Sequence, residues 1–239
     1  FVGSDDGHLF WLNAITGKAL WQTKLPDHTD KATDYYETQR LMSDIITLDE
    51  ESGKVVVTST DGWVHMYDLR EKRHEWGTLV FENDPNDYSP SDYVLMSPTA
   101  DITGDGLAEV LLSKTRDSDR YSGYMTNGKR ALCDSAGNIV WRLGTSDRDS
   151  SVWPGMAFET TIFEGKPVYL DRSESEPWAI RLIDLKDGES VLHTIPLDAF
   201  GSLSVFLMQP GGNGYLCFSS TGDLAAISAK GELLWYYPR

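Results

Sequence analysis

The sequence lacks any uninterrupted apolar segment of the roughly 20 residues that a transmembrane helix needs, although 40% of its 239 residues are hydrophobic. It contains only two cysteines, Cys133 and Cys217, too few for a disulfide-rich scaffold. No Cys-x-x-Cys or paired Cys/His spacing indicates a zinc site. We expect two buried thiols, and a disulfide between them is the alternative.

Positive charge is scarce, since the sequence has 21 Lys and Arg but 37 Asp and Glu, and the formal net charge is −16. An acidic protein repels phosphate backbones and anionic membrane surfaces. We therefore expect no nucleic-acid partner and no membrane insertion. The five histidines are dispersed, and no catalytic triad order, phosphate loop or paired-carboxylate motif stands out. The catalytic residues are unknown, and the sequence does not decide whether the protein is an enzyme.

Helical periodicity is absent too, and a tryptophan-ended repeat is the strongest pattern present. Gly17 to Trp21 recurs as 137–141 and 231–235, with degenerate copies at 72–76 and 188–192. Each copy follows two apolar stretches that a small polar turn separates, which is typical of strand, turn and strand. Short strands repeated at this spacing predict an all-β fold, a β-propeller of four-stranded blades.

The repeats divide the chain into four complete blades and one partial blade within a single domain, 1–239. We expect the outermost strands at 18–24, 73–80, 138–143, 189–195 and 232–237, and the innermost strands at 41–49, 94–101, 152–161 and 202–209. The partial blade, 1–25, has no innermost strand. We therefore favour a fragment of a larger propeller. The total blade number and the completeness of the chain stay open, as does the oligomeric state.

Long connections are concentrated where function would be expected, because loops on a rigid scaffold commonly carry binding residues. In a four-stranded meander, the connections at 26–40, 81–93, 144–151 and 115–129 open on one face. Aromatic rings and polar groups suit sugars, and they suit protein partners equally well. The candidate ligand-binding residues on this face are Tyr35, Tyr36, Tyr88, Tyr93, Arg116, Arg120, Tyr121 and Trp153.

The segment from Asp101 to Glu109 has oxygen-bearing side chains at positions suited to one hard cation. The candidate ligands are Asp101, Thr103, Asp105, the backbone carbonyl of Leu107, and Glu109. The spacing resembles the calcium loop of integrin-like FG-GAP propeller repeats, which implies a structural calcium ion on the face opposite the usual ligand site. Thr103 stands where that family usually has Asp or Asn, and this removes one charge. A metal-free Gly-Asp-Gly turn is the alternative.

The repeated tryptophans resemble the docking positions of quinoprotein-type (PQQ-like) repeats, over nearly the whole chain. In those repeats the tryptophan packs between neighbouring blades, so we interpret Trp21, Trp76, Trp141 and Trp235 as core residues. The resemblance carries no PQQ, because the adjacent cysteines of the quinone enzymes have no match here. Outer-membrane assembly lipoproteins share the repeat, which makes a protein-interaction scaffold one alternative function.

Residues 97–144 resemble one blade of the rhamnogalacturonan lyases, which are calcium-dependent propeller enzymes. Those enzymes carry several Asp-rich loops and this chain has one, so no catalytic residue transfers. A basic group nearby could hold a uronate: Lys114, Arg116, Arg120, Lys129 and Arg130. The alternative is a solvated loop whose cations pair with Asp117 and Asp119.

The favoured interpretation is an extracytoplasmic protein, secreted or periplasmic, that binds carbohydrate on the long-loop face. A polysaccharide lyase of rhamnogalacturonan-lyase type and a protein-interaction scaffold are the two alternatives. The sequence leaves the identity of the ligand open.

Overall fold

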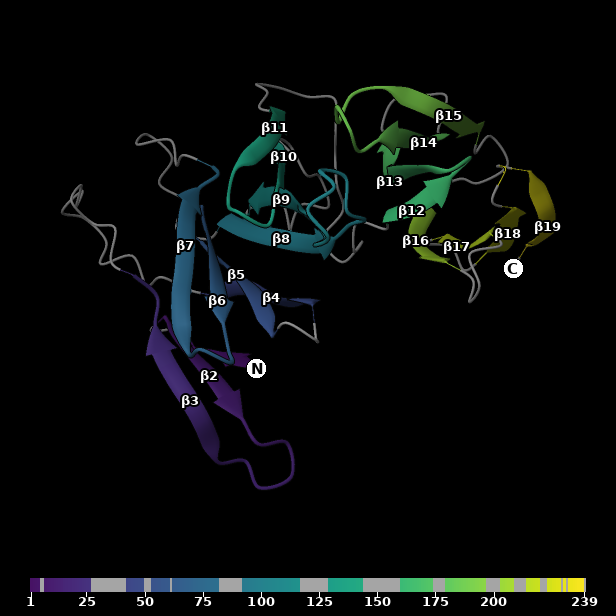
Figure 1. Ribbon diagram of the computed structural model, residues 1–239. Coiled ribbons are helices and arrows are strands. Elements are labelled where there is room, and N and C mark those ends of the chain that lie inside the picture. The colour runs from purple at the N-terminus through teal and green to yellow at the C-terminus, as the bar shows by residue number, and fades with distance from the viewer. Residues whose placement is uncertain are drawn as a thin grey trace.

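The computed structural model describes residues 1–4, 7–26, 42–49, 53–60, 62–81, 92–116, 129–143, 160–173, 179–196, 203–208, 214–219, 223–228, 230 and 232–238. These residues form nineteen strands and no helix, arranged in five antiparallel sheets (Figure 1). The expected all-β class is therefore confirmed. One sheet has three strands and four sheets have four, and in each sheet the strands pair with their neighbours in the sequence.

The sheets are numbered here in chain order. Sheet 1 contains β1 (Val2–Gly3), β2 (His8–Leu12) and β3 (Ala19–Lys24). Sheet 2 contains β4 (Met42–Asp49), β5 (Lys54–Ser59), β6 (Trp63–Asp68) and β7 (Arg73–Leu79). Sheet 3 contains β8 (Asp92–Pro98), β9 (Val110–Arg116), β10 (Lys129–Cys133) and β11 (Ile139–Leu143). Sheet 4 contains β12 (Thr160–Phe163), β13 (Lys166–Ser173), β14 (Ala179–Asp184) and β15 (Val191–Pro196). Sheet 5 contains β16 (Leu203–Met208), β17 (Gly214–Ser219), β18 (Leu224–Ser228) and β19 (Leu233–Tyr237).

Consecutive sheets pack face to face, and Figure 1 shows the five following one another around an open arc. Leu9 of sheet 1 shares an apolar core with Tyr67 of sheet 2. Three further cores join sheets 2 and 3, sheets 3 and 4, and sheets 4 and 5. Central strands are therefore covered on both faces, which explains why Val55, Val56 and Val57 are consecutive and all fully buried.

Two of the repeated tryptophans join neighbouring sheets through the same contact. The Trp76 indole N–H donates to the carbonyl oxygen of Ser135 at 2.9 Å, and that of Trp141 donates to Leu185 at 2.7 Å. The rings lie on glycines of the following sheet: a Cβ added at Gly137 would lie 2.7 Å from Trp76, and one at Gly188 would lie 2.9 Å from Trp141. The two tryptophans thus pack between neighbouring sheets, as expected, and both are partly buried.

The remaining copies of the repeat differ from this contact. Trp21 is half-buried and meets the Tyr67 ring edge-on, with centroids 5.9 Å apart. Leu192, which replaces tryptophan in sheet 4, packs against the core between sheets 4 and 5. The interpretation of Trp235 as core is wrong, since its side chain is 46% exposed. The physical reason is that β19 lies at the open end of the arc, where no described segment covers the Trp235 ring.

The strand expected at 152–161 ends later than predicted, because β12 spans Thr160–Phe163. A two-residue hairpin explains the later position: Phe163 pairs with Lys166, and Glu164 and Gly165 both have positive φ, at 49° and 79°. Such a turn fixes the register of both strands, so β12 must continue to Phe163. Residues 151–159 lie outside the described residues.

Cys133 is a free buried thiol on β10, in agreement with the expectation for that residue. Burial, together with the neighbouring Asp134, raises the pKa of the Cys133 thiol to about 12. A thiol of this kind is a packing group rather than a nucleophile. Cys217 lies on β17, and its side chain is outside the described residues.

Candidate functional site

One end of the sheets carries the long connections, and the strand pairing defines it. Because neighbouring strands within a sheet are antiparallel, the first residues of β8 and β10 and the last residues of β9 and β11 lie at one end of sheet 3. In sheet 3, Asp92 is opposite Arg116 and Lys129 is opposite Lys114. This end, called here the long-connection end, is where residues 25–41, 80–91, 117–128 and 144–159 leave and rejoin the sheets.

Only two of the eight predicted ligand-binding residues fall on described backbone. Tyr93 on β8 and Arg116 on β9 occupy adjacent strands at the long-connection end. The other six lie outside the described residues: Tyr35, Tyr36, Tyr88, Arg120, Tyr121 and Trp153. Tyr93 and Arg116 were expected in the connections 81–93 and 115–129, whereas they lie on adjacent strands. The convergence of the full set stays a prediction.

Arg130, from the predicted basic group, is buried at the interface between sheets 3 and 4 near this end. Its guanidinium Nη2 donates to Asp171 Oδ1 at 2.5 Å, and Nη1 lies 3.4 Å from the Tyr169 hydroxyl. Arg181, directly opposite Asp171 in sheet 4, donates from Nη2 to the second carboxylate oxygen. The alternative of a solvated basic loop is therefore wrong for Arg130, which lies within the packed interface.

The electrostatics of this group follow from its burial. The Asp171 side chain is 3% exposed and carries ion pairs to two guanidinium groups. Burial alone would lower the pKa of Arg130, but the Asp171 carboxylate outweighs it and holds that pKa above its ordinary value. The Arg130 guanidinium also lies 5.3 Å from the centre of the Tyr169 ring, a cation–π arrangement. Arg130 is therefore a fixed cation.

Arg181 occupies a different environment from Arg130. Its side chain is 34% exposed, while its buried Nε has no hydrogen-bond acceptor among the described residues. Ser113, opposite Arg130 in sheet 3, likewise has a buried hydroxyl with no described partner. The Nη donors of Arg181 that Asp171 does not use can bind an anionic group such as a carboxylate.

The sequence carries a signal for two of these residues that our predictions missed. Asp171 directly follows the apolar run 167–170, and Arg181 interrupts the apolar run 179–183. Charges in a strand that is covered on both faces need partners, so the two could have been predicted to pair. The partner across the interface, Arg130, could not be found by that reasoning, because it comes from another sheet.

The Asp-rich connection joins β8 to β9 at the end of sheet 3 opposite the long connections, as predicted. Asp101 accepts hydrogen bonds from the backbone N–H groups of Gly104 at 2.6 Å and Gly106 at 2.9 Å. The buried Glu109 carboxylate accepts from the N–H groups of Ile102 at 2.7 Å and Thr103 at 2.8 Å. The carboxylates of Asp101 and Glu109, at the two ends of this segment, thus hold its backbone in a tight turn through hydrogen bonds.

The carboxylates of this connection face different donors rather than one point. Asp105 accepts from the Ser135 hydroxyl and from the Leu107 N–H at 2.8 Å, and these two bonds, the Ser135 bond first, lower the pKa of Asp105. Thr103 donates its hydroxyl to Glu109 at 2.7 Å. No group of three His, Cys, Asp or Glu within the described part of the chain could hold a metal. The oxygen ligands suit calcium in type, and calcium binding at this connection stays a prediction.

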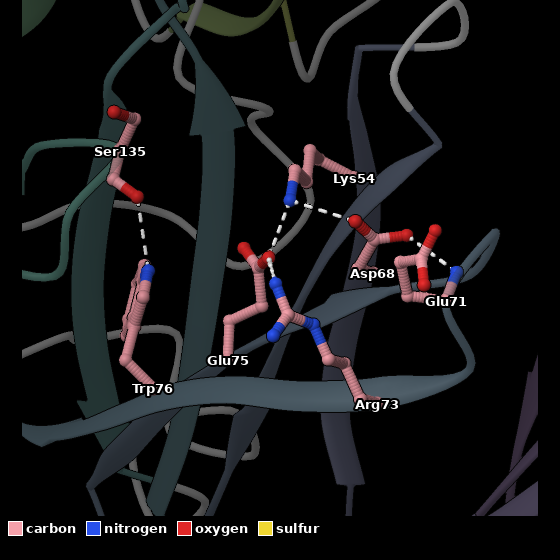
Figure 2. Close-up of polar contacts among 7 residues, drawn as sticks. All are labelled: Lys54, Asp68, Glu71, Arg73, Glu75, Trp76 and Ser135. Carbon is pink, nitrogen blue, oxygen red and sulfur yellow. Dashed lines mark hydrogen bonds and ion pairs between the residues drawn. The ribbon is translucent and has the colours of Figure 1, made fainter.

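A second polar group lies in sheet 2, at the end opposite the long connections (Figure 2). Lys54 Nζ contacts Asp68 at 3.0 Å and Glu75 at 2.6 Å, and Arg73 contacts Glu75 at 3.2 Å. Burial would lower the pKa of Lys54, but Glu75 and Asp68 outweigh it and raise that pKa. Two cations and two carboxylates satisfy one another here, so this group stabilises the sheet and is a poor candidate for ligand binding.

Comparisons with known proteins leave the function of the chain open. No family model matches the sequence, and no curated protein matches it. Among solved structures, a protein of unknown function from Bacteroides caccae is similar, with 12% sequence identity and a TM-score of 0.48. The match covers 99% of this chain and 70% of that one. In the described part of the chain, no helix has the length and apolar character needed to cross a membrane.

Proposed function

We propose that the five sheets are consecutive blades of a β-propeller, with sheet 1 as a partial blade. Each sheet is a meander of consecutive strands, and each packs face to face on the next around the arc in Figure 1. The repeated tryptophan contacts between sheets 2 and 3 and between sheets 3 and 4 support the same arrangement. Radial repetition of this kind is the defining property of propellers.

We further propose that the propeller binds carbohydrate at its long-connection end. One observation carries the proposal: the strand pairing brings the flanking ends of the long connections to the same side of the sheets. Those connections contain Tyr35, Tyr36, Tyr88, Arg120 and Trp153, residue types that stack on sugar rings and bind hydroxyl or acidic groups. An extracytoplasmic location belongs to the same proposal, because it rests on the resemblance to propellers of that compartment.

A glycan array followed by calorimetry on the strongest ligand tests this proposal. Replacing Tyr36 or Trp153 by Ala should weaken binding by about 1–2 kcal/mol each, because each substitution removes a stacking contact comparable to an interface anchor. Tyr237→Ala is the matched control, since Tyr237 is an exposed aromatic residue on β19, outside the long connections. An array without any bound glycan would overturn the proposal.

The polysaccharide lyase alternative is tested with the same ligands. Incubation with a uronate polymer should release unsaturated products that absorb in the ultraviolet, and Arg116→Gln or Arg120→Gln should suppress them. Binding without product formation would assign the protein to the class of binding proteins rather than enzymes.

The exposed last strand favours a protein-interaction scaffold as the second candidate function. All five side chains of β19 are exposed, and Tyr237 reaches 68%. Contiguous exposed apolar residues of this kind mark interaction surfaces. A photoreactive amino acid at position 237 should then cross-link to one defined protein in the native host, and Trp235→Ala should abolish that product. Absence of a defined cross-link would count against the scaffold.

A further inference from the structure

We propose that Arg181, held in place by Asp171 and Arg130, binds a carboxylate group of an acidic carbohydrate at the interface between sheets 3 and 4. This inference rests on the proposed carbohydrate binding and adds the charge class of the ligand. It assigns the contact to a residue outside the long connections, on a strand of the sheet itself.

The location fits the proposed ligand face. Arg181 is the third residue of β14, Asp171 is the third residue from the end of β13, and Arg130 is the second residue of β10. All three positions lie near the long-connection end of sheets 3 and 4, because β13 ends and β10 and β14 begin there. The other end of the interface is filled by apolar packing around Trp141 and Leu185. The polar group therefore lies toward the same end of the sheets as the long connections.

The division of roles follows from the ion pairs. The Asp171 carboxylate is already paired with the buried Arg130, so Arg181 is a second guanidinium on the same carboxylate. Arg181 donates one hydrogen bond from Nη2 to Asp171, and its Nε is buried. The remaining Nη donors are therefore the ones that can bind a ligand. A planar guanidinium presents five N–H donors in a rigid fork that matches a carboxylate. Arg181 is thus the contact residue, and Asp171 and Arg130 are positioning residues.

The position of the guanidinium is fixed before a ligand arrives. Asp171 is anchored from the opposite sheet by Arg130, whose guanidinium also lies against the Tyr169 ring. The Tyr169 hydroxyl in turn donates to the Gly188 carbonyl at 2.8 Å. Pre-organisation lowers the entropy lost on binding, so a single exposed arginine can contribute specificity for an anionic group.

Calorimetric titration with three probes tests the inference: oligogalacturonate, a sulfated oligosaccharide of similar length, and a neutral cello-oligosaccharide. The wild-type protein should bind oligogalacturonate most tightly, and Arg181→Gln should weaken that binding at least tenfold. Added salt should weaken it as well, because an exposed ion pair is screened. Arg73→Gln is the matched control, since Arg73 is an exposed arginine at the opposite end of the sheets, and it should leave binding unchanged.

Thermal melting separates loss of the contact from loss of the fold. Should Arg181→Gln fail to fold, Arg181→Lys keeps the charge and removes the fork, and it should weaken oligogalacturonate binding several-fold. If Arg181→Gln folds, unchanged oligogalacturonate binding by this variant would overturn the inference. If it does not fold, unchanged binding by Arg181→Lys would overturn it.

The three probes also separate this inference from the proposed function. Binding of the neutral oligosaccharide alone overturns the acidic-ligand inference and leaves carbohydrate binding standing. Binding of the sulfated probe without the uronate overturns the assignment to a carboxylate. Failure of all three probes, with a blank glycan array, overturns the proposed function itself.

Discussion

The indole N–H of Trp76 in sheet 2 donates a hydrogen bond of 2.9 Å to the backbone carbonyl of Ser135 in sheet 3 (Figure 2). Beside it, Thr78 donates its hydroxyl to the Gly137 carbonyl at 2.7 Å. The turn at 134–138 therefore holds the outer strand of the preceding sheet through two carbonyl oxygens. The Ser135 hydroxyl donates in the opposite direction, to Asp105 of the Asp-rich connection. One turn thus links that connection to the interface between sheets 2 and 3.

Gly137→Ala should destabilise the protein by about 2–4 kcal/mol. A left-handed residue with a Cβ costs roughly 1 kcal/mol or more, and Gly137 has φ +85°. The new Cβ would also lie 2.7 Å from the Trp76 ring, and overpacking typically adds about 1–3 kcal/mol. Chemical denaturation measures the loss.

Gly17→Ala is the matched control for this substitution. Gly17 occupies the same repeat position with φ +68°, but a Cβ there would have nothing within 4 Å. The loss should then be only about 1 kcal/mol, the backbone cost alone. Equal losses for the two variants would show that the Trp76 contact does not constrain Gly137.

Lys72→Gly should stabilise the protein by about 0.5–1 kcal/mol. Lys72 stands at the repeat position of Gly17 and Gly137 and has φ +53°, a left-handed conformation that is unfavourable for lysine. Glycine removes this strain from the folded state. It also increases the conformational entropy of the unfolded chain, which offsets part of the gain in stability. Lys18→Gly, at an exposed lysine that is not left-handed, should instead destabilise. A rise in the midpoint of urea unfolding for Lys72→Gly alone is the expected result.

Ser135→Ala should raise the pKa of Asp105 toward its ordinary value, because the Ser135 hydroxyl is the main cause of its lowered pKa. A carboxylate with a lowered pKa stabilises the fold above about pH 4 and loses that contribution as the pH falls through its folded pKa. The variant should therefore lose less stability on acidification. Carboxyl NMR titration is the measurement. Asp187, whose pKa is lowered chiefly by Ser190, is the internal control and should not change.

Calcium binding by Asp101, Thr103, Asp105, Leu107 and Glu109 stays a proposal. The described hydrogen bonds of Asp105 and Glu109 would have to be exchanged for the ion. If calcium binds, the melting temperature in excess calcium should be higher than in a chelator. The reason is that a ligand at 100-fold its Kd adds about 2.7 kcal/mol to the free energy of unfolding. Thr103→Asp should enlarge the difference by restoring a carboxylate ligand. The proposal would be overturned if both the wild type and Thr103→Asp had the same melting curve in calcium as in a chelator.

The repeat determined much of the fold by itself. A tryptophan at the end of a strand and a glycine at the preceding turn are local signals, and antiparallel strands between short turns need few distant contacts to be recognised. Eight of the nine outermost and innermost strands that were predicted overlap closely with observed ones, and β12 is the exception. Its position depends on the Glu164-Gly165 turn, which is hard to predict because a glutamate with positive φ is uncommon.

Only the tertiary structure decided which charged residues meet across the interface between sheets 3 and 4. Arg130, Asp171 and Arg181 come from two sheets and three strands, and sequence spacing carries no information on packing across an interface. The tertiary structure also decided the exposure of Trp235. Trp141 occupies the same repeat position and packs against a neighbouring sheet, whereas Trp235 is half-exposed at the open end of the arc. Strand periodicity is a property of the local backbone, whereas burial and ion pairing depend on which sheet lies opposite.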